Sequence, residues 1–298
     1  MKVYAHTMAG KFGLALSGGG ARGFAHIGVL RALGRRWQPD FIAATSMGAV
    51  VAAIYAARLD VDWVEKVARD FARRSLRLLW DWKLAVGGLL SGRRIEEFLR
   101  GYLGDMQFRD LKIPIAVTAT DIQRGAAITI REGDVVSALR ASFSIPGLLA
   151  PVWRRVGQEE LLLVDGGVSD PLPVDLLHRE GCGAVLAVSA NPDYTRPSID
   201  PRRLPTTEIT MRSFYVMQKF ISVPNLRPQD MVIELNLEDC PFLDFKRIDF
   251  LMEQGSLQIR EALPILEARL RGAPARKAPF WKQLLERLKG IGTGRTRP

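Results

Sequence analysis

The sequence predicts a doubly wound α/β fold with a mainly parallel central sheet. Two consecutive units carry this prediction, and each is a short apolar strand followed by a tight turn and a helix. The strands are expected at 12–17 and 40–44, the turns at 18–23 and 45–48, and the helices at 24–35 and 48–59. Strands that alternate with helices pair in parallel, because each helix carries the chain back across the sheet.

The α/β pattern continues to about residue 272 without a linker long enough to separate two domains. Further strands are expected at 114–120, 126–131, 161–164, 184–190 and 231–235. Further helices are expected at 62–74, 93–101, 134–141, 173–179, 207–221 and 247–270. The stretch 75–92 fits neither pattern, so we predict a lid-like insert there. We expect one domain, 1–272, followed by a basic C-terminal appendage, 273–298.

The composition is that of an ordinary globular protein. Of 298 residues, 47% are hydrophobic and 25% are charged, which excludes disordered and fibrous chains. No apolar run approaches the roughly 20 residues that a membrane span needs. The first residues, MKVYAHTMAGKF, lack the apolar core of a signal peptide, and two cysteines cannot build a disulfide framework. We therefore expect a cytoplasmic protein.

Positive charge is concentrated in two short segments. Nine basic residues and one acidic residue lie between Arg269 and Pro298, and seven basic and two acidic residues lie between Arg69 and Arg94. Both segments contain tryptophan, and residues 279–291 place apolar side chains at the spacing of an amphipathic helix. A nucleic-acid binder spreads such charge over a folded face, whereas basic segments with aromatic residues suit an anionic membrane. We predict peripheral binding to the inner face of the membrane and no nucleic acid; solvated helix faces and a loose tail are the alternative.

Ser46 lies between a short strand and a helix, in the segment Ala44-Thr45-Ser46-Met47-Gly48. In the nucleophile-elbow pattern Gly-x-Ser-x-Gly, a strained turn exposes a serine hydroxyl at a helix N-terminus. Ala44 replaces the first glycine of that pattern, and Gly48 provides the second. The segment indicates a nucleophilic serine, and the alternative is a serine that only caps the helix.

The turn Gly18-Gly19-Gly20-Ala21-Arg22-Gly23 follows the first strand and opens a helix. Successive glycines at such a position present backbone N–H groups to an anion, either a bound phosphate or a transient oxyanion. Gly18, Gly20 and Gly23 also fit the dinucleotide fingerprint, but we expect no acidic residue on a second strand where that fingerprint needs one. Arg22 adds a cation beside the turn.

Asp165 follows four apolar residues, which places it at the carboxyl end of a predicted strand, where open α/β sheets bind ligands. The alternative is a turn aspartate, because Asp-Gly is a turn dipeptide. His178 follows Asp165 in the chain order of a Ser-Asp-His triad, but it lies in a helix close behind that strand. We expect His178 to be poorly placed for Ser46, which leaves Asp165 as the available base.

Four blocks of the chain, in this order, resemble the patatin-like phospholipase family and especially its bacterial members. The blocks are Gly18–Gly23, Thr45–Gly48, Ala138–Val152 and Asp165–Val168. The resemblance covers about residues 11–190 and continues more weakly to about 270. It implies a three-layer α/β/α fold and a Ser–Asp dyad in which Ser46 is the nucleophile and Asp165 the base. It also implies that the turn Gly18–Gly20, with Arg22, is the oxyanion site.

Together these features predict a serine acyl hydrolase that acts on lipid esters, of the phospholipase A or lysophospholipase type. Its substrate would be a phospholipid or lysophospholipid. No cluster of His, Cys, Asp or Glu has the spacing of metal ligands, so we expect no metal and no other cofactor. Two alternatives stay open. One is a non-catalytic, membrane-associated regulatory module of the same fold, suggested by Ala44 and the appendage; the other is an acyltransferase.

Overall fold

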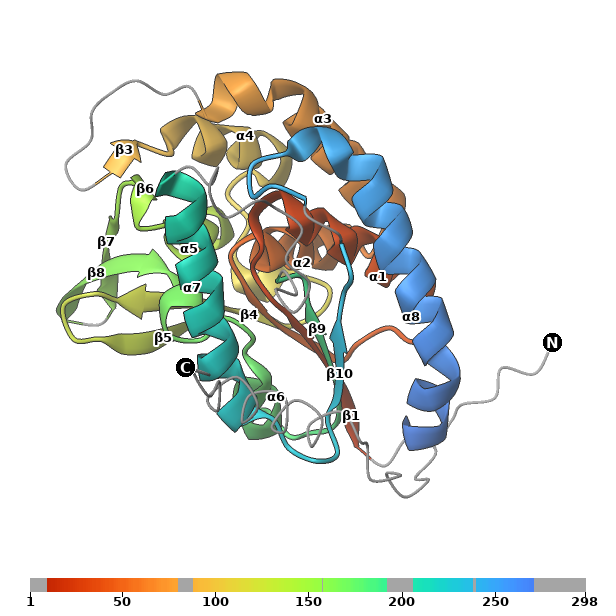
Figure 1. Cartoon of the computed structure of the whole chain (residues 1–298). Coiled ribbons are helices and arrows are strands. Elements are labelled where there is room, and N and C mark those ends of the chain that lie inside the picture. Colours follow the sequence, from red (N-terminus) through yellow and green to blue (C-terminus); the bar gives the residue numbers. More distant parts are fainter. Residues whose placement is uncertain (1–9, 80–87, 157, 192–205, 238–239, 271–298) are drawn as a thin grey trace, which may run out of the picture.

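The computed structural model describes residues 10–79, 88–156, 158–191, 206–237 and 240–270, and Figure 1 shows its α/β architecture. In this part of the chain, eight strands form one sheet in the order β10-β9-β1-β2-β4-β8-β7, with β5 paired to β4. These strands are β1 Lys11–Leu16, β2 Phe41–Thr45, β4 Ile115–Asp121, β5 Ala126–Ile130, β7 Val152–Val156, β8 Glu159–Asp165, β9 Cys182–Ser189 and β10 Met231–Glu234. The pairs from β10 to β4 are parallel, as predicted, and those of β5, β7 and β8 are antiparallel.

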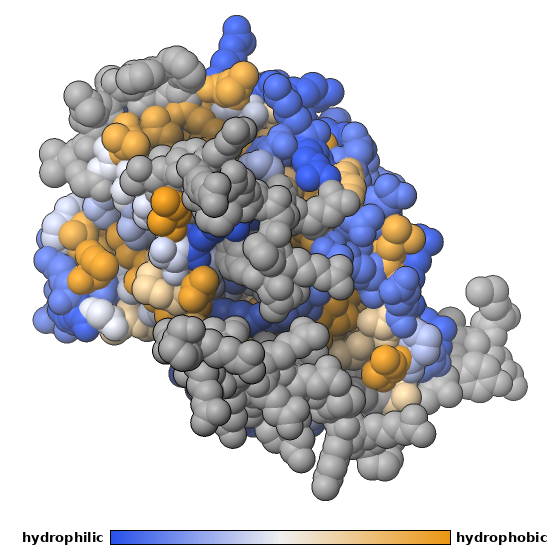
Figure 2. All heavy atoms as spheres, viewed as in Figure 1, coloured by the Kyte–Doolittle hydropathy of each residue, from blue (hydrophilic) through white to orange (hydrophobic). Residues whose placement is uncertain are grey.

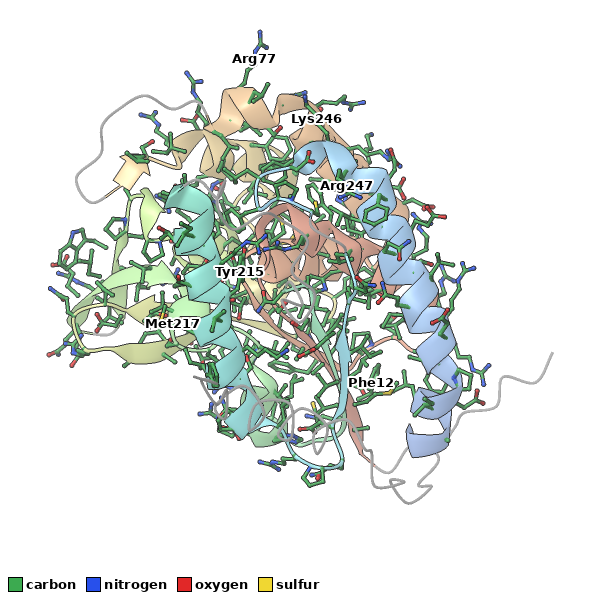
Figure 3. All side chains as sticks on the ribbon, viewed as in Figure 1. Phe12, Arg77, Tyr215, Met217, Lys246 and Arg247 are labelled. Atoms are coloured by element: carbon green, nitrogen blue, oxygen red, sulfur yellow. The ribbon has the colours of Figure 1, made fainter. Side chains whose placement is uncertain are left out.

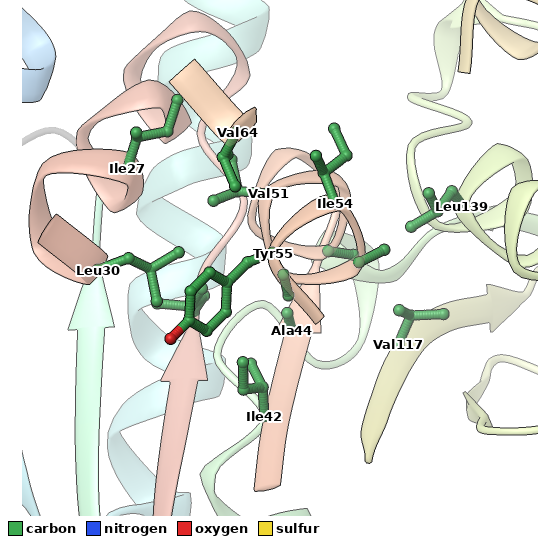
Figure 4. Close-up of a cluster of buried hydrophobic side chains, with 14 of the residues drawn as sticks. Ile27, Leu30, Ile42, Ala44, Val51, Ile54, Tyr55, Val64, Val117 and Leu139 are labelled. Atoms are coloured by element: carbon green, nitrogen blue, oxygen red, sulfur yellow. The ribbon is translucent and has the colours of Figure 1, made fainter. Parts of the chain in front are cut away.

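Helices cover both faces of this sheet and make three layers, as predicted. They are α1 Ala25–Leu33, α2 Met47–Arg58, α3 Val61–Leu79, α4 Arg93–Leu103, α5 Val135–Ser142, α6 Val174–Arg179, α7 Thr206–Ser222 and α8 Ile248–Leu270. Side chains of a strand alternate between the two faces. Ile42 and Ala44 of β2 therefore enter the larger core, shared with α1 to α5 and α8 (Figure 4). Phe41 and Ala43 enter a smaller core with α6.

Two parts of the fold differ from the sequence-based expectation. Helix α3 continues to Leu79 rather than ending at residue 74, and Gly88–Leu90 forms a strand, β3, that pairs in parallel with β6, Gly147–Leu149. Residues 75–79 and 88–90 of the predicted lid-like insert are thus helix and strand, while residues 80–87 lie outside the described residues. Of the hairpin formed by β7 and β8, only residues 161–164 were predicted as a strand. The Arg and Glu residues in the rest of the hairpin interrupt the apolar pattern from which strands were predicted.

The order of strands around β4 brings two strand ends together. Residues 117–121 of β4 pair with β5 along one edge. The opposite edge pairs with β2 up to Thr118 and with β8 from Ala119 onward. Because β8 runs antiparallel to β4, the carboxyl ends of β2 and β8 meet head to head on that edge. The residues that follow β2 therefore lie next to the last residue of β8.

Among the described residues, no helix is both long and apolar enough to cross a bilayer. The basic appendage at 273–298, with its expected amphipathic helix, lies outside the described residues, as do the tryptophans Trp80, Trp82 and Trp281. The domain boundary at residue 272 and the role of the appendage stay predictions.

Helices α1 and α8 cross so closely that only glycine fits at the contact. A Cβ added at Gly255 of α8 would lie 2.0 Å from the carbonyl oxygen of Ala25, which is far inside contact distance. We expect Gly255→Ala to lower the free energy of unfolding by about 1–3 kcal/mol, the usual cost of overpacking. Urea denaturation measures it.

Gly101 of α4 provides the matched control for this prediction. A Cβ there would meet nothing within 4 Å, so Gly101→Ala should instead stabilise the protein by about 0.5–1 kcal/mol through helix propensity. Equal effects of the two substitutions would contradict the close helix crossing.

Candidate active site

Ser46 occupies a strained turn between β2 and α2. Its backbone φ of 53° lies in the left-handed region that non-glycine residues rarely adopt, and such strain costs about 1–3 kcal/mol. Ser46 stands at the N-cap position of α2, but its side chain makes no capping hydrogen bond. The hydroxyl instead donates a hydrogen bond to Asp165. The geometry therefore fits the nucleophile-elbow interpretation rather than a helix cap.

The predicted elbow residues make this tight turn possible. A Cβ at Gly48 would lie 2.4 Å from the carbonyl oxygen of Ser17, so the start of α2 can pass β1 only without a side chain there. Ala44 is fully buried in the larger core, and its methyl group faces α2 rather than solvent (Figure 4). The extra methyl relative to glycine is thus accommodated by packing.

Asp165 accepts the hydrogen bond of the Ser46 hydroxyl, with 2.6 Å between Oγ and Oδ2. Its other carboxylate oxygen accepts a hydrogen bond from the backbone N–H of Gly167 at 2.7 Å. Burial raises the pKa of the Asp165 carboxyl to about 6, although these two hydrogen bonds act in the opposite direction. Asp165 ends a strand, as predicted, but it reaches Ser46 because β8 meets β2 head to head, not because both end at one edge of a parallel sheet.

Two serines that the sequence analysis did not single out hold this pair in place. The hydroxyl of Ser142 accepts a hydrogen bond from the Ser46 N–H at 3.0 Å, and the carbonyl of Ser144 accepts one from the Asp165 N–H at 2.9 Å. The buried guanidinium of Arg140 in turn donates to the Ser144 hydroxyl. All three belong to the block Ala138–Val152, which the sequence analysis used for the family resemblance. That resemblance pointed to the block but assigned no role to these residues.

The glycine turn passes directly beside Ser46. A Cβ at Gly18 would lie 3.1 Å from the Cβ of Ser46, and Gly20 lines the same cavity as Ser46. Gly19 and Gly20 have φ values of 140° and 58°, which favour glycine. Within the described part of the chain, the N–H groups of Gly18, Gly19 and Gly20 have no hydrogen-bond partner. Their binding of an oxyanion stays a prediction.

Arg22 is buried, and its described contacts join it to Cys240 and Tyr215 rather than to Ser46. One guanidinium nitrogen donates to the carbonyl of Cys240 at 3.0 Å, and the group stacks over the ring of Tyr215 on α7, labelled in Figure 3. The N–H of Ala21 also donates to the carbonyl of Phe242 at 2.8 Å. These contacts tie the glycine turn to the segment that walls the cavity, and direct binding of an oxyanion by Arg22 stays a prediction.

Neither described histidine contacts the Ser46–Asp165 pair. His178 bonds to Asp230, with 2.9 Å between Nε2 and the carboxylate, just before β10 begins. That position is at the amino edge of the parallel strands, opposite Ser46. His26 is buried in α1 and donates from Nε2 to the carbonyl of Ser17 at 2.9 Å; burial lowers its pKa to about 4. His178 is thus placed away from Ser46, as expected.

An apolar cavity opens at Ser46. It has about 770 Å³ of space between its lining atoms, a figure that includes open solvent. Its walls come from α2, α3 and α4, from the loop after α5 and from residues 242–245. Among the described residues, Ser46 provides the only polar side chain of this lining.

These parts form a site suited to acyl chemistry. A hydroxyl already bonded to a carboxylate can lose its proton to that carboxylate as it attacks a carbonyl carbon. The free N–H groups of the glycine turn and the N-terminal dipole of α2 both favour negative charge there. The described residues hold no group of His, Cys, Asp and Glu that could bind a metal ion.

Comparison with known proteins gives a family match. The family model described as patatin-like phospholipase matches residues 14–178. An uncharacterized NTE family protein of Mycobacterium bovis is 37% identical over 199 residues, which are 65% of this chain and 53% of that protein. A second such protein of the same species is 31% identical over 282 residues, 87% of this chain and 48% of that protein. The chain thus spans about half the length of these relatives.

Two further matches extend the comparison. Neuropathy target esterase sws of Drosophila melanogaster is 31% identical over 180 residues, covering 59% of this chain and 12% of that protein. Among solved structures, human GIVD cytosolic phospholipase A2 superposes with a TM-score of 0.50 and 10% identity, over 89% of this chain and 62% of that chain. The structural similarity shows a shared fold.

The raised pKa of Asp165 predicts a specific pH dependence of stability. Between its unfolded pKa of 3.8 and its folded pKa of about 6, the folded state binds the proton more tightly. The stabilisation is therefore complete below the unfolded pKa and is lost as pH rises through about 6. Asp165→Asn removes this slope, so the variant should gain stability relative to wild type between about pH 4 and pH 7.

Denaturation of both proteins at these two pH values checks the prediction. Asp165→Glu, which keeps the ionisable group, is the control and should retain a pH slope. If the difference in the free energy of unfolding between wild type and Asp165→Asn did not change with pH, the pKa of the buried Asp165 carboxyl would not be raised.

Proposed function

Because the chain belongs to the patatin-like phospholipase family, we propose that it is a serine acyl hydrolase that cleaves lipid esters, of the phospholipase A or lysophospholipase type. The observation that carries the proposal is the 2.6 Å hydrogen bond from Ser46 to the buried Asp165 at an otherwise apolar cavity. An acyl chain suits such a cavity, since burial of apolar surface drives binding. The name of the Drosophila relative, neuropathy target esterase, agrees with this reaction class.

In the proposed mechanism, Ser46 and Asp165 act as a dyad. Asp165 accepts the hydroxyl proton as Ser46 Oγ bonds to the ester carbonyl carbon, and that proton then passes to the departing alcohol. Water attacks the acyl-Ser46 ester in the second half, and Asp165 again accepts a proton before Ser46 is restored. The backbone N–H groups of Gly18, Gly19 and Gly20 bind the oxyanion in both halves, and one such donor is worth about 3 kcal/mol in the transition state.

The substrate in this proposal comes from an anionic membrane surface. Leu243 lines the cavity and is 44% exposed, so the cavity reaches the surface beside residues 242–245. Near that end lie exposed basic residues of α3 and Lys246, and Figure 3 shows Arg77 pointing away from the body. Figure 2 shows hydrophobic residues gathered near this end and over α7, while α8 is largely hydrophilic. Basic residues beside an exposed apolar rim suit anionic headgroups.

Removal of either dyad member should abolish ester hydrolysis without unfolding the protein. Ser46→Ala and Asp165→Asn should each lower kcat for p-nitrophenyl and phospholipid esters by about four orders of magnitude, and the double variant should lose little more. The reason is that a nucleophile and its base act as one unit. Steady-state kinetics, with circular dichroism as the folding check, measure this.

His178→Ala is the control for the dyad, because His178 pairs with Asp230 at the far edge of the sheet. It should leave kcat within about twofold of wild type once folding is confirmed. A folded His178→Ala as inactive as Asp165→Asn would refute the dyad. Added alcohols as acceptors in the same assay distinguish hydrolysis from acyl transfer, and absence of any turnover would support the non-catalytic alternative.

Activity should rise with pH and reach half its maximum near pH 6. Asp165 accepts a proton only when it is ionised, and burial sets the pKa of its carboxyl to about 6. The pH profile of kcat/KM for a neutral ester measures this. Asp170 is the matched control, because burial also raises the pKa of its carboxyl to about 6. Asp170→Asn should keep the wild-type pH profile. If this variant no longer lost activity below about pH 6, the titrating group would be Asp170 rather than Asp165.

A further inference from the structure

We propose that the cavity is a blind pocket whose closed end, formed by Ile54, Val64 and Leu99, limits the length of the acyl chain that this protein accepts. The inference rests on the proposed function, since it places the ester carbonyl at Ser46. It adds a chain-length preference and the residues that set it.

The pocket extends from Ser46 along α2. That helix begins at Met47, directly after Ser46, and Val50, Val51 and Ile54 on one side of it line the cavity. Figure 4 shows Val51 and Ile54 on this helix with Val64 of α3 above it. With a rise of 1.5 Å per residue, Ile54 lies about 12 Å from Ser46 along the helix axis.

Helices α3 and α4 run antiparallel over this floor. The ring of Trp63 on α3 lies 5.5 Å from that of Tyr102 on α4. Further along α3, the ring of Phe71 lies 5.6 Å from that of Phe98, which comes earlier on α4. The two helices therefore run in opposite directions. Val64 therefore lies at the same end as the last turns of α4. Leu99, one helical turn before Tyr102, lines the cavity near that end.

Contacts between the helices close that end. Arg58, the last residue of α2, stacks over Trp63 of α3 at 3.8 Å, and the ring of Trp63 packs against that of Tyr102 of α4 at 5.5 Å. These contacts join α2, α3 and α4 beyond the cavity.

The exposure of the residues at the two ends agrees with this direction of the pocket. The side chains of its far end are almost inaccessible, with Ile54 at 3%, Val64 at 1% and Leu99 at 2%. At the opposite end Leu243 is 44% exposed. The pocket is therefore open near Ser46 and residues 242–245 and closed at Ile54.

The distance from Ser46 to the closed end of the pocket limits the number of acyl carbons that the pocket can hold. An extended hydrocarbon with C–C bonds of about 1.5 Å advances about 1.3 Å per carbon, so the roughly 12 Å from Ser46 to Ile54 spans at most about nine carbons beyond the ester carbonyl. Chains near that length should fill the pocket, and longer chains must bend or leave carbons in solvent. We expect kcat/KM to rise from butanoate to decanoate esters and to fall at hexadecanoate.

Ala68 offers the test, because it lines the pocket one helical turn from Val64 and has a small side chain. Ala68→Phe fills the middle of the cavity. It should lower kcat/KM for p-nitrophenyl decanoate by about tenfold more than for the butanoate, since a hydrophobic pocket discriminates even one methylene about tenfold. Ile54→Ala deepens the closed end and should shift the optimum to longer chains.

Ala72→Phe is the matched control, because Ala72 lies one turn further along α3 and does not line the cavity. It should keep the wild-type profile. Equal losses for every chain length in Ala68→Phe, the same shift in Ala72→Phe, or a wild-type profile without a maximum would overturn the inference.

A second measurement separates failure of this inference from failure of the proposed function. Calorimetric binding of saturated fatty acids to Ser46→Ala needs no turnover. Tightest binding near decanoic acid, weakened by a further Ala68→Phe, supports the blind pocket even if no ester is hydrolysed. Ester hydrolysis with no dependence on chain length in either assay would leave the proposed function intact and reject the pocket.

Discussion

The hydrogen bond between Ser46 and Asp165 is the interaction on which the rest of the site depends. It joins residues 119 positions apart in the sequence. It forms because β2 and β8 share one edge of β4 and meet at their carboxyl ends. The register of β4 therefore places the hydroxyl and the carboxylate together. Burial at this meeting point raises the pKa of Asp165 into the range where a carboxylate is both ionised near neutral pH and basic enough to accept a proton.

This arrangement is costly, and the surrounding structure holds it in place. Ser46 adopts a strained backbone conformation, and Asp165 is a carboxyl in an apolar interior. Ser142 and Ser144 fix the backbone of both residues through hydrogen bonds. The close approaches at Gly18 and Gly48 bring the turn and the helix against the elbow. The scaffold thus offsets the strain at the residues that the proposed reaction needs.

The sequence predicted the parts of the site that are encoded locally. The glycine turn and the elbow each appear as a few consecutive residues between a strand and a helix, so Ser46 and Gly18 to Gly20 could be recognised without a structure. Asp165 was recognised at a strand end, but the direction of β8 depends on long-range pairing that no local pattern carries. Ser142 and Ser144 were missed because neither a lone hydroxyl nor a backbone carbonyl in a helix or loop has a distinguishing sequence pattern. The cavity was missed because the apolar spacing of α3 and α4 is the same as that of a filled core.

The most direct test of the Ser46–Asp165 dyad is peptide mass spectrometry after reaction with an alkyl fluorophosphonate. The account predicts one modified residue, Ser46, with a labelling rate that rises through about pH 6 and is lost in Asp165→Asn, since Asp165 must be ionised to accept the hydroxyl proton. Labelling at another residue, or labelling of Ser46 that proceeds at the wild-type rate in folded Asp165→Asn, would contradict it.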